Sequence, residues 1–476
     1  MPPSRQNIAL LRDRPTDFPR IHHDSDHDGQ QPASGRELVS KQHGIGAMAQ
    51  PSRTTNDAVD PVVITGIGLI ASVGQNREAV WNGVREGRSG VRFLKGLVGI
   101  PDGLLLGAPV DLEPNLPRQL KVTALCQQVA AEALADAQVD TATMNGGRLD
   151  RDRFACAISG HIGDTGWLER HVGDYDISQP GAVEWWQQWL PNTSCVTVAN
   201  EHGLYGPRIC HSTACASGLI DILSAVRAIR HGQADIALAG SGEAFHPLFA
   251  AGFHQMRVLA YNDVPAEACR PFDLARSGFV MGEGAAMLVV ERLSHAQRRG
   301  AKIYAEVLGG SMHAEAHHVT DLDTESAALV RLIHDALDAS KLSPTDIGYI
   351  NVHGTGTQQN DLVEARGIRR ALGPAADRAC ASAVKSMLGH LVNASGSVEL
   401  AITALALRDG FVPPTLNLTR QDPACELDCI PLVGRQRSIE HALKISVAFG
   451  GHLAAVALRR WSGANSASRP LRISAA

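Results

Sequence analysis

A chain of 476 residues is too long for one simple hydrophobic core and predicts roughly two to three domain-sized units. The composition, 44% hydrophobic and 20% charged, is ordinary for a globular protein, and a net charge of −5 gives no general sign of nucleic-acid binding. No apolar run reaches the roughly 18 residues of a membrane span, and nine cysteines without the dense spacing of a secreted disulfide scaffold favour a cytoplasmic location.

Both ends of the chain have the composition of disordered tails. Residues 1–58 are polar, lack periodicity and contain no apolar signal-peptide core. Because patterned sequence starts only at Pro61, Met48 is an alternative start site. The cluster HHDSDHD at 22–28 offers metal-type ligands, but a flexible tail gives them no fixed geometry and we predict no metal there. Residues 462–476 indicate a second tail.

The first patterned stretch is PVVITGIGLIASVG at 61–74. Its spaced glycines suggest a dinucleotide-binding turn, but Ala71 replaces the third glycine of that motif, so we predict a core strand and a tight turn instead. Downstream, the pattern predicts helices at 77–86 and 122–137 and a strand at 154–159.

The stretch GPRICHSTACASGLI at 206–220 places Cys215 among small residues that neither shield its sulfur nor hinder a tight turn. Apolar residues then recur at steps of three and four, which predicts a helix from near Cys215 to near His231. A helix N-terminus favours the thiolate, the nucleophilic form of cysteine. An inert buried cysteine fits this stretch equally well.

Apolar runs after this helix predict strands at 234–244 and 287–293, and strands alternating with helices indicate a layered α/β architecture. Two later stretches carry polar side chains suited to catalysis. In NVHGTGTQQND, His353 should lie where a strand ends and a Gly-rich loop begins, and SAVKSMLGH places Lys385 and His390 five residues apart.

With these stretches in view, the chain resembles the β-ketoacyl synthases, the condensing enzymes of fatty-acid and polyketide synthesis, and most closely the ketoacyl-ACP synthase II type. Order and spacing of the motifs match that family from about Pro61 to Arg460. The matching motifs are TACASG around Cys215, RPFDLARSGFVMGEGAA at 270–286, HGTGT from His353, KS and GH at Lys385 and His390, and FGG at 449–451.

The resemblance implies the thiolase-like fold, in which two similar halves form a layered αβαβα structure. We place the halves at 59–300 and 301–461. No internal repeat is visible in the sequence, so the expected doubling depends on the resemblance alone.

The resemblance also implies the chemistry. Cys215 would take an acyl group from a carrier thioester, and decarboxylation of a malonyl thioester would supply the carbanion that attacks it. His353 and His390 would donate N–H groups to the thioester oxygen on which charge develops, and backbone N–H groups of Cys215 and Phe449 would hold the tetrahedral oxyanion.

Supporting roles follow from the same resemblance. Lys385 would hold the electrostatic and hydrogen-bond network around His390 and the thiolate. Glu364 would be a buried acidic support, although an exposed helix charge is the alternative. Phe449 would gate the acyl pocket, with Gly450 in the same turn. We predict neither a cofactor nor a metal.

The chain departs from the family pattern in several places. ISVAFGGHL at 445–453 stands where NSFGFGGTN is usual, and Ala448 should restrict backbone φ in the gating loop. Gln358 and Gln359 replace a Pro-containing pair, and Ser277 replaces an Asp. These changes leave the catalytic groups intact and favour a divergent substrate.

Three other groups of residues allow more than one interpretation. Four tryptophans suit an acyl pocket or a subunit interface, but local core packing explains them as well. HAEAHH at 313–318 and the pair Cys425 and Cys429 imitate metal ligands without a convincing pattern. The tryptophans are Trp167, Trp185, Trp186 and Trp189.

We expect an acidic acyl carrier protein as partner, a homodimer, and neither nucleic acid nor a membrane span. Candidate docking residues for the carrier are Arg118 with Lys121 and Arg227 with Arg230. Two other functions remain open: a non-catalytic partner subunit of a heterodimeric condensing enzyme, and a thioester acyltransferase or thiolase-like enzyme. The second is disfavoured because thiolases use a second Cys as base where this chain offers two His.

Overall fold

The computed structural model describes residues 60–95, 101–113, 119–139, 149–160 and 190–463, which belong to one compact unit. Most of the two predicted tails and Arg118 lie outside these ranges, as do the four tryptophans named above. The domain boundary placed near residue 300 stays a prediction.

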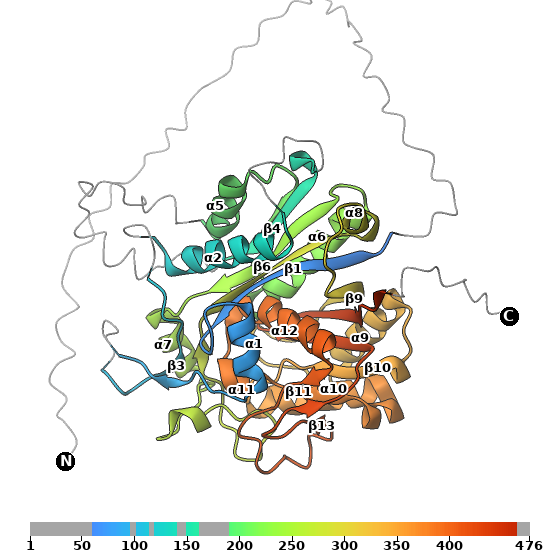
Figure 1. Cartoon of the computed structure of the whole chain (residues 1–476). Coiled ribbons are helices and arrows are strands. Elements are labelled where there is room, and N and C mark those ends of the chain that lie inside the picture. The colour runs from blue at the N-terminus through green and yellow to red at the C-terminus, as the bar shows by residue number, and fades with distance from the viewer. Residues whose placement is uncertain (1–59, 96–100, 114–118, 140–148, 161–189, 464–476) are drawn as a thin grey trace, which may run out of the picture. The chain divides into compact units, whose positions relative to one another are not determined.

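One mixed sheet of eleven strands forms the framework (Figure 1), in the order β13-β11-β10-β15-β16-β9-β1-β8-β6-β4-β5. Pairing of β1 with β9 makes the sheet continuous, because Val62, Val63 and Ile64 face Val307, Glu306 and Ala305. The strands are β1 Val62–Ala71, β4 Phe154–Ser159, β5 Arg208–Ile209, β6 Ile236–Glu243, β8 Gly284–Arg292, β9 Ala305–Ala314, β10 Ile347–Asn351, β11 Cys380–Ser382, β13 Asp428–Cys429, β15 His441–Ala448 and β16 His452–Arg460.

The sheet contains the same arrangement twice. The strands β1, β8, β6, β4 and β5 have the neighbours and directions of β9, β16, β15, β10 and β11: two antiparallel pairings followed by two parallel ones. The helices between them, α2, α5 and α6 in one half and α9, α10 and α12 in the other, occur at the same points of the chain. The two-halved fold is thereby confirmed.

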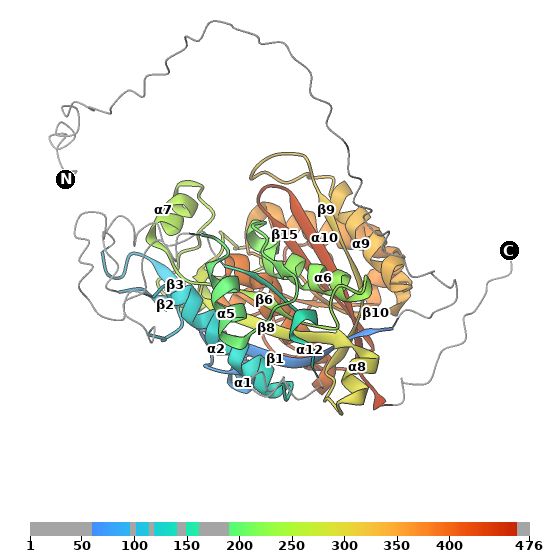
Figure 2. The same cartoon turned by 90° about the horizontal axis from the view of Figure 1, so that it is seen from above.

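Helices cover the outer faces and fill the middle (Figures 1 and 2). Helices α2 and α5 pack on strands of the first half, α9 packs on β9 and β16 of the second, and α10 packs on α9. Helices α6 and α12 contact each other and strands of both halves, which gives the αβαβα layers. Their bounds are α2 Lys121–Asp136, α5 Thr193–His202, α6 Ser217–Arg230, α9 Ala327–Ser340, α10 Gln358–Leu372 and α12 Ser395–Asp409.

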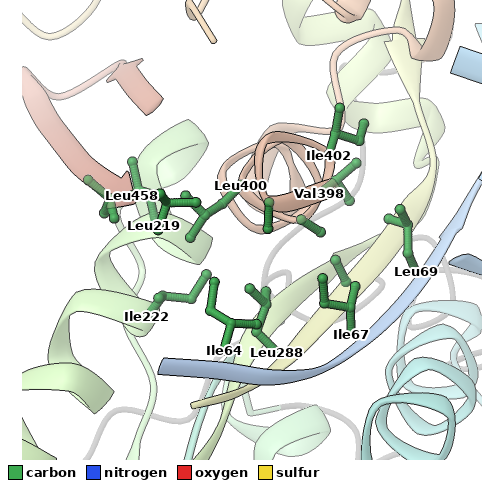
Figure 3. Packing of buried hydrophobic residues seen from close by; sticks show 14 of the residues in the cluster. Ile64, Ile67, Leu69, Leu219, Ile222, Leu288, Val398, Leu400, Ile402 and Leu458 are labelled. Carbon is green, nitrogen blue, oxygen red and sulfur yellow. The ribbon is translucent and has the colours of Figure 1, made fainter. Parts of the chain in front are cut away.

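Sequence explains why α12 is central. Every residue from Ser395 to Leu407 is buried, and a helix that is small or apolar on all sides belongs inside a protein. In Figure 3, side chains of α12 and α6 pack over strands β1, β8 and β16. These side chains are Val398, Leu400 and Ile402 of α12, Leu219 and Ile222 of α6, Ile64, Ile67 and Leu69 of β1, Leu288 of β8 and Leu458 of β16.

The central helices meet at two glycines. A Cβ on Gly396 would lie 2.6 Å from the backbone N of Leu219, and one on Gly218 would lie 3.0 Å from that of Ser397. Residues with a side chain would therefore push the two N-termini apart. This contact fixes the position of Cys215, which lies at the start of α6.

The glycines of β1 serve packing and not nucleotide binding. A Cβ on Gly66 would lie 2.3 Å from the carbonyl oxygen of Ala133, and one on Gly68 would lie 1.9 Å from that of Val129. Both oxygens belong to α2, which lies directly against the strand. The predicted core strand and tight turn are confirmed, since Ala71 and Gly74 exchange backbone hydrogen bonds.

The other predicted elements are present within one to three residues of the expected bounds. Smaller elements complete the unit, and none of the helices in the described ranges has the length and apolarity to cross a bilayer. They are α1 Arg77–Arg85, α7 Pro247–Gln255, α8 Leu293–Arg298, α11 Lys385–Leu388, a small sheet of β2 Arg92–Phe93, β3 Leu106–Ala108 and β7 Met281–Gly282, and the pair β12 Phe411–Val412 and β14 Arg435–Gln436.

Candidate active site

Cys215 lies in a tight turn that leads into α6. Residues Ala214–Ala216 form one turn of 3-10 helix, and Ala214 has a φ of +46°, a strained conformation for a residue with a Cβ. The Oγ of Ser217 accepts from the backbone N–H of Thr213 at 2.9 Å and donates to the Ala214 carbonyl at 2.8 Å. The turn is therefore held from both sides.

Two imidazoles approach the sulfur. His353 follows β10, and His390 follows α11, in a different part of the chain. The sulfur of Cys215 and ring nitrogens of both histidines all lie within 4.8 Å of one another, and all three residues are buried. The two rings are 5.3 Å apart between centroids and nearly perpendicular, at 84°. The structure thus brings together the three residues named from the sequence.

Hydrogen bonds define the tautomer of His390. The backbone N–H of Val392 donates to Nδ1 at 3.2 Å, so this nitrogen carries no proton in the neutral ring. Ser395 Oγ lies 2.9 Å from the same atom and is positioned to donate as well. The proton of the neutral ring is therefore on Nε2, which leaves an N–H donor on the opposite side of the ring.

His353 is held in the same tautomer by Lys385. The ammonium of Lys385 lies 3.4 Å from Nδ1 of His353 and donates to the backbone oxygen of that residue at 2.7 Å. The expected hydrogen bonds of Lys385 to the surroundings of His390 are wrong, since they go to His353, but its expected electrostatic effect is present: its charge acts to lower the pKa of both His390 and Cys215. Lys385 begins α11, and its side chain bonds to the loop that follows β10.

Glu364 is fully buried and supports the same loop, so the exposed alternative is wrong. It accepts from the backbone N–H groups of His353 at 2.5 Å and of Gly354 at 2.8 Å. Burial raises its pKa to about 7, and those two hydrogen bonds oppose the rise.

Sequence reasoning missed two buried charged residues, Glu399 and Lys444. Glu399 on α12 accepts from Lys385 at 2.6 Å, and the ammonium of Lys444 on β15 lies 2.5 Å from its other carboxylate oxygen. Each is a lone charge within an otherwise apolar run, SVELAI or HALKISVA. Because buried charges need partners, this pattern was the available signal.

The electrostatics keep both imidazoles neutral. Burial, followed by the positive charges around them, lowers the pKa of His353 and of His390 well below the usual value. Both rings can consequently donate Nε2–H near pH 7 without carrying a charge. For a site that stabilises an oxyanion, neutral donors of this kind are suitable.

The resting sulfur differs from the expectation. Burial raises the pKa of the Cys215 thiol to about 12, although Lys385 and the backbone N–H groups of Cys215 and Phe449 act to lower it. The position at the helix N-terminus does not outweigh burial, so the resting group is a thiol. The influence of the two backbone N–H groups also means that both lie close to the sulfur.

The loop after β15 carries the second of these N–H groups. Gly450 and Gly451 have φ values of +82° and +72°, which glycine adopts readily. Ala448, in contrast, is the last residue of β15 and has an ordinary negative φ. In this structure Ala448 needs no conformation that its Cβ disfavours, and the expected restriction of the loop's movement stays a prediction.

Family models match most of this unit. Residues 117–296 match the model of the β-ketoacyl synthase N-terminal domain, and residues 304–419 match that of the C-terminal domain. The chain is 36% identical over 427 residues to the tetracenomycin polyketide synthase ketoacyl synthase alpha subunit of Streptomyces glaucescens, covering 85% of this chain and 98% of that one. It is also 36% identical over 409 residues to 3-oxoacyl-[acyl-carrier-protein] synthase 2 of Coxiella burnetii, covering 84% and 98%.

Among solved structures, a type II polyketide ketosynthase in complex with its acyl-carrier protein and bound to the hexaketide superposes with a TM-score of 0.77. Sequence identity is 31%, and the match covers 85% of this chain and 100% of that one. This chain belongs to the β-ketoacyl synthase family. It is a condensing enzyme of the acyltransferase type.

Two cavities of the synthase meet at the sulfur. The first, of about 460 Å³, has both polar and apolar residues on its wall, and the second, of about 800 Å³, is mainly apolar. Cys215, Phe253, Met256 and Phe449 line both. The rings of Phe253 and Phe449 are 6.4 Å apart. Phe449 thus stands at the boundary where a gate would act.

Most of the departures from the family pattern lie on the walls of these cavities. Ser277, Gln358 and Gln359 line the first cavity, and Gln359 donates to Leu322 O at 3.2 Å, which ties it to the opposite wall. His452 lines the second cavity. Its polar companions there are Ser212, Gln255 and Asn393.

Two of the four docking residues expected for the carrier have partners within the chain. Lys121 donates to Val110 O and to Glu283, both at 2.6 Å. Arg230 donates to the carbonyls of Val307 and Leu308 on β9. Both cations are therefore committed to bonds within the chain. Arg227 is exposed, and its part in docking stays a prediction.

The groups that imitated metal sites have other partners. In HAEAHH, His313 lies 2.7 Å from Asp335, and His317 lies 3.8 Å from Asp321. Within the described ranges, Cys215 with the two histidines is the one group whose donor atoms gather as metal ligands do. That no metal binds stays a prediction.

Proposed function

We propose that this synthase performs decarboxylative condensation of acyl and malonyl thioesters, with Cys215 as nucleophile. One observation carries the proposal: a buried sulfur lies within 4.8 Å of two imidazoles that are neutral and present Nε2–H. Neutral donors fit an anionic intermediate, whereas a strong general base would be expected for direct proton abstraction from carbon.

In the first step, Cys215 attacks the carbonyl carbon of an acyl thioester. A carbon–sulfur bond to Cys215 forms, the bond to the carrier sulfur breaks, and the thiol proton leaves with the carrier thiol. The backbone N–H groups of Cys215 and Phe449 are placed to hold the tetrahedral oxyanion, because both lie close to the sulfur.

In the second step, the bond between the carboxylate and the α-carbon of a malonyl thioester breaks and carbon dioxide leaves. The electron pair moves toward the thioester oxygen, where His353 and His390 donate hydrogen bonds. It then forms the new carbon–carbon bond to the acyl group, and the bond to Cys215 breaks. The released sulfur takes up one proton from water, which restores the thiol.

We propose an acyl carrier protein as the donor of both thioesters. The wall of the first cavity mixes apolar side chains with polar ones such as Thr355, Thr357 and Asn360, which suits the polar amide groups of a carrier's prosthetic arm. Arg257 also lines it, is exposed and has no side-chain partner among the described residues. This arginine joins Arg227 as a candidate docking cation for an acidic carrier.

The assembly is a second proposal. A homodimer and a heterodimer with a chain length factor are both compatible with the fold, and the solved relatives include a ketosynthase with its chain length factor. A purely non-catalytic partner role is disfavoured, since such a subunit would need neither the sulfur nor both imidazoles. Native mass spectrometry of the purified chain separates homodimer from monomer. The cytoplasmic location stays a prediction.

The test of the chemistry has two readouts. After incubation with an acyl carrier thioester, intact-protein mass spectrometry should show one acyl adduct, mapped by peptide analysis to Cys215. Carbon dioxide should then be released from malonyl carrier protein. Adduct formation without carbon dioxide would indicate a simple acyltransferase, and the lack of both would defeat the proposal.

A further inference from the structure

Beside His353 lies a buried triad, Lys385, Lys444 and Glu399, that contains two cations and one carboxylate. Lys385 and Lys444 are both fully buried and share the single carboxylate of Glu399, at 2.6 Å and 2.5 Å. Lys444 also donates to the carbonyl of Val352 at 3.3 Å, next to His353, and to that of Ile445. With both lysines charged, this triad carries a net charge of +1, and its three side chains are buried from solvent.

Burying a net charge lowers the free energy of unfolding, because the ion loses its hydration. Replacing a buried charge by an apolar side chain of similar size is often neutral or stabilising, so a second lysine here is not explained by stability. A carboxylate and Lys385 alone would already form a neutral pair. The extra ammonium therefore points to a function in which negative charge appears nearby.

We propose that Lys444 is a positioning residue for condensation: acting through Glu399 and Lys385, it keeps the site net positive while the anion forms. This inference rests on the proposed function. The developing enolate and the expelled sulfur of Cys215 are both anionic, and an immobile positive charge in a water-poor site stabilises them without reorganisation.

The field of Lys444 reaches the reacting groups. Among the causes that lower the pKa of both His353 and His390 is the charge of Lys444. It thus helps to keep the imidazoles neutral while favouring an anion between them. Five titratable groups face or influence Lys444 from the elements around it: Glu399 on α12, Lys385 on α11, Glu364 on α10, and the two histidines.

Lys444 can lose its charge within an accessible pH range. Burial lowers its pKa to about 8, and the attraction of Glu399 limits the decrease. Lys444 is an ammonium ion below about pH 8, and above that pH it is neutral, so the triad loses its net positive charge. The rate of malonyl decarboxylation should accordingly fall as the pH rises through about 8.

The experiment compares wild-type protein with Lys444→Met and Lys444→Arg. With malonyl carrier protein as the probe, we expect decarboxylation by the Met variant at pH 7 to fall by about 10-fold, the equivalent of one pKa unit of lost interaction. Its rate should stay flat across pH 8. The Arg variant retains a charge that does not titrate, so it should keep more activity and also lose the alkaline decrease.

The free energy of unfolding, measured against pH, distinguishes a positioning role of Lys444 from a purely structural one. The folded-state pKa lies below the ordinary value of 10.5, so the unfolded chain binds more protons between pH 8 and 10.5 and wild-type stability rises with pH there. The Met variant should lack this rise and be at least as stable at pH 7. Lys341→Met, an exposed lysine at the end of α9, is the matched control and should change neither property.

The outcomes are distinguishable. A Met variant with the wild-type rate and an unchanged decrease near pH 8 overturns the inference, as does a loss of rate explained by loss of folded protein. If the Met variant does not fold, the profiles of wild type and Lys444→Arg decide: an alkaline decrease that persists in the Arg variant also overturns it. Failure of the proposed function would appear earlier, as wild-type protein that forms no adduct on Cys215.

Discussion

The two halves of the synthase have the same plan but place different residues at the same point. The N-terminus of α6 carries Ala-Cys-Ala-Ser-Gly at 214–218, and that of α12 carries Val-Asn-Ala-Ser-Gly at 392–396. Ala214 and Val392 both have positive φ, and the two glycines form the contact between the helices. Cys215 therefore corresponds to Asn393.

Each of these two residues reaches the opposite half. Cys215 approaches His353, which follows β10, while Asn393 donates to the carbonyl of Gly160, which follows β4, at 2.9 Å. Strands β4 and β10 are themselves equivalent. The duplicated framework thus creates two similar positions, and only one of them holds a nucleophile. The two halves have nearly the same backbone plan, but the nucleophile lies in the first half only.

The largest loss of activity is expected at Cys215, and its equivalent Asn393 provides the comparison. Cys215→Ala should abolish acylation and lower condensation by at least about 1000-fold, because the covalent step is lost. Asn393→Ala, its counterpart, should lower the rate by less than about 10-fold, the worth of one hydrogen bond. Adduct mass spectrometry and carbon dioxide release measure both. Similar losses in the two variants would contradict the assignment of the nucleophile to one half.

The imidazoles give the next effect. His353→Ala or His390→Ala should reduce malonyl decarboxylation by about 100- to 1000-fold, the usual effect of removing one oxyanion donor. Acylation of Cys215 should continue, since the backbone N–H groups serve that step. Measuring both reactions in the same variant tests the division of roles. Loss of acylation together with decarboxylation would show that the histidines act on the sulfur instead.

Adding a side chain at either glycine of the contact between α6 and α12 should destabilise the protein. Gly396→Ala should lower the free energy of unfolding by about 1–3 kcal/mol, because the added Cβ overpacks the contact between α6 and α12. Gly218→Ala should have an effect of similar size, because its Cβ would meet Ser241 Oγ on β6 at 2.1 Å as well as the backbone of α12. Urea unfolding followed by circular dichroism measures this. Gly252→Ala in α7 is the control: nothing lies within 4 Å of its added Cβ, and its stability should not decrease. Unchanged stability in both central variants would contradict the contact.

The smallest effect concerns the two equivalent serines. Ser395 contacts His390, whereas Ser217 holds the turn beside Cys215. Ser395→Ala should lower decarboxylation by about 3- to 10-fold and leave acylation unchanged, whereas Ser217→Ala should affect acylation to a similar degree. A stopped-flow comparison of the two half-reactions separates them. If both variants slowed the same step, the two halves would not divide the work as described.

The sequence by itself determined a large part of this protein. Apolar periodicity located the strand at 154–159 and the helix after Cys215, and motif order identified the family and the four groups Cys215, His353, Lys385 and His390. These features depend on local spacing. The doubling of the fold remained invisible, because α6 and α12 share only a few identical residues while strand order and direction repeat throughout.

Only the tertiary structure decided which partners the charged residues have. Lys385 bonds to His353 and not to His390, Lys121 is committed to Glu283, and Lys444 shares Glu399, three outcomes that spacing along the chain could not reveal. The resting state of the sulfur was likewise decided by burial, which outweighs the helix N-terminus. Charges inside a protein respond to their neighbours in space and to the absence of water, and neither is written in the local sequence.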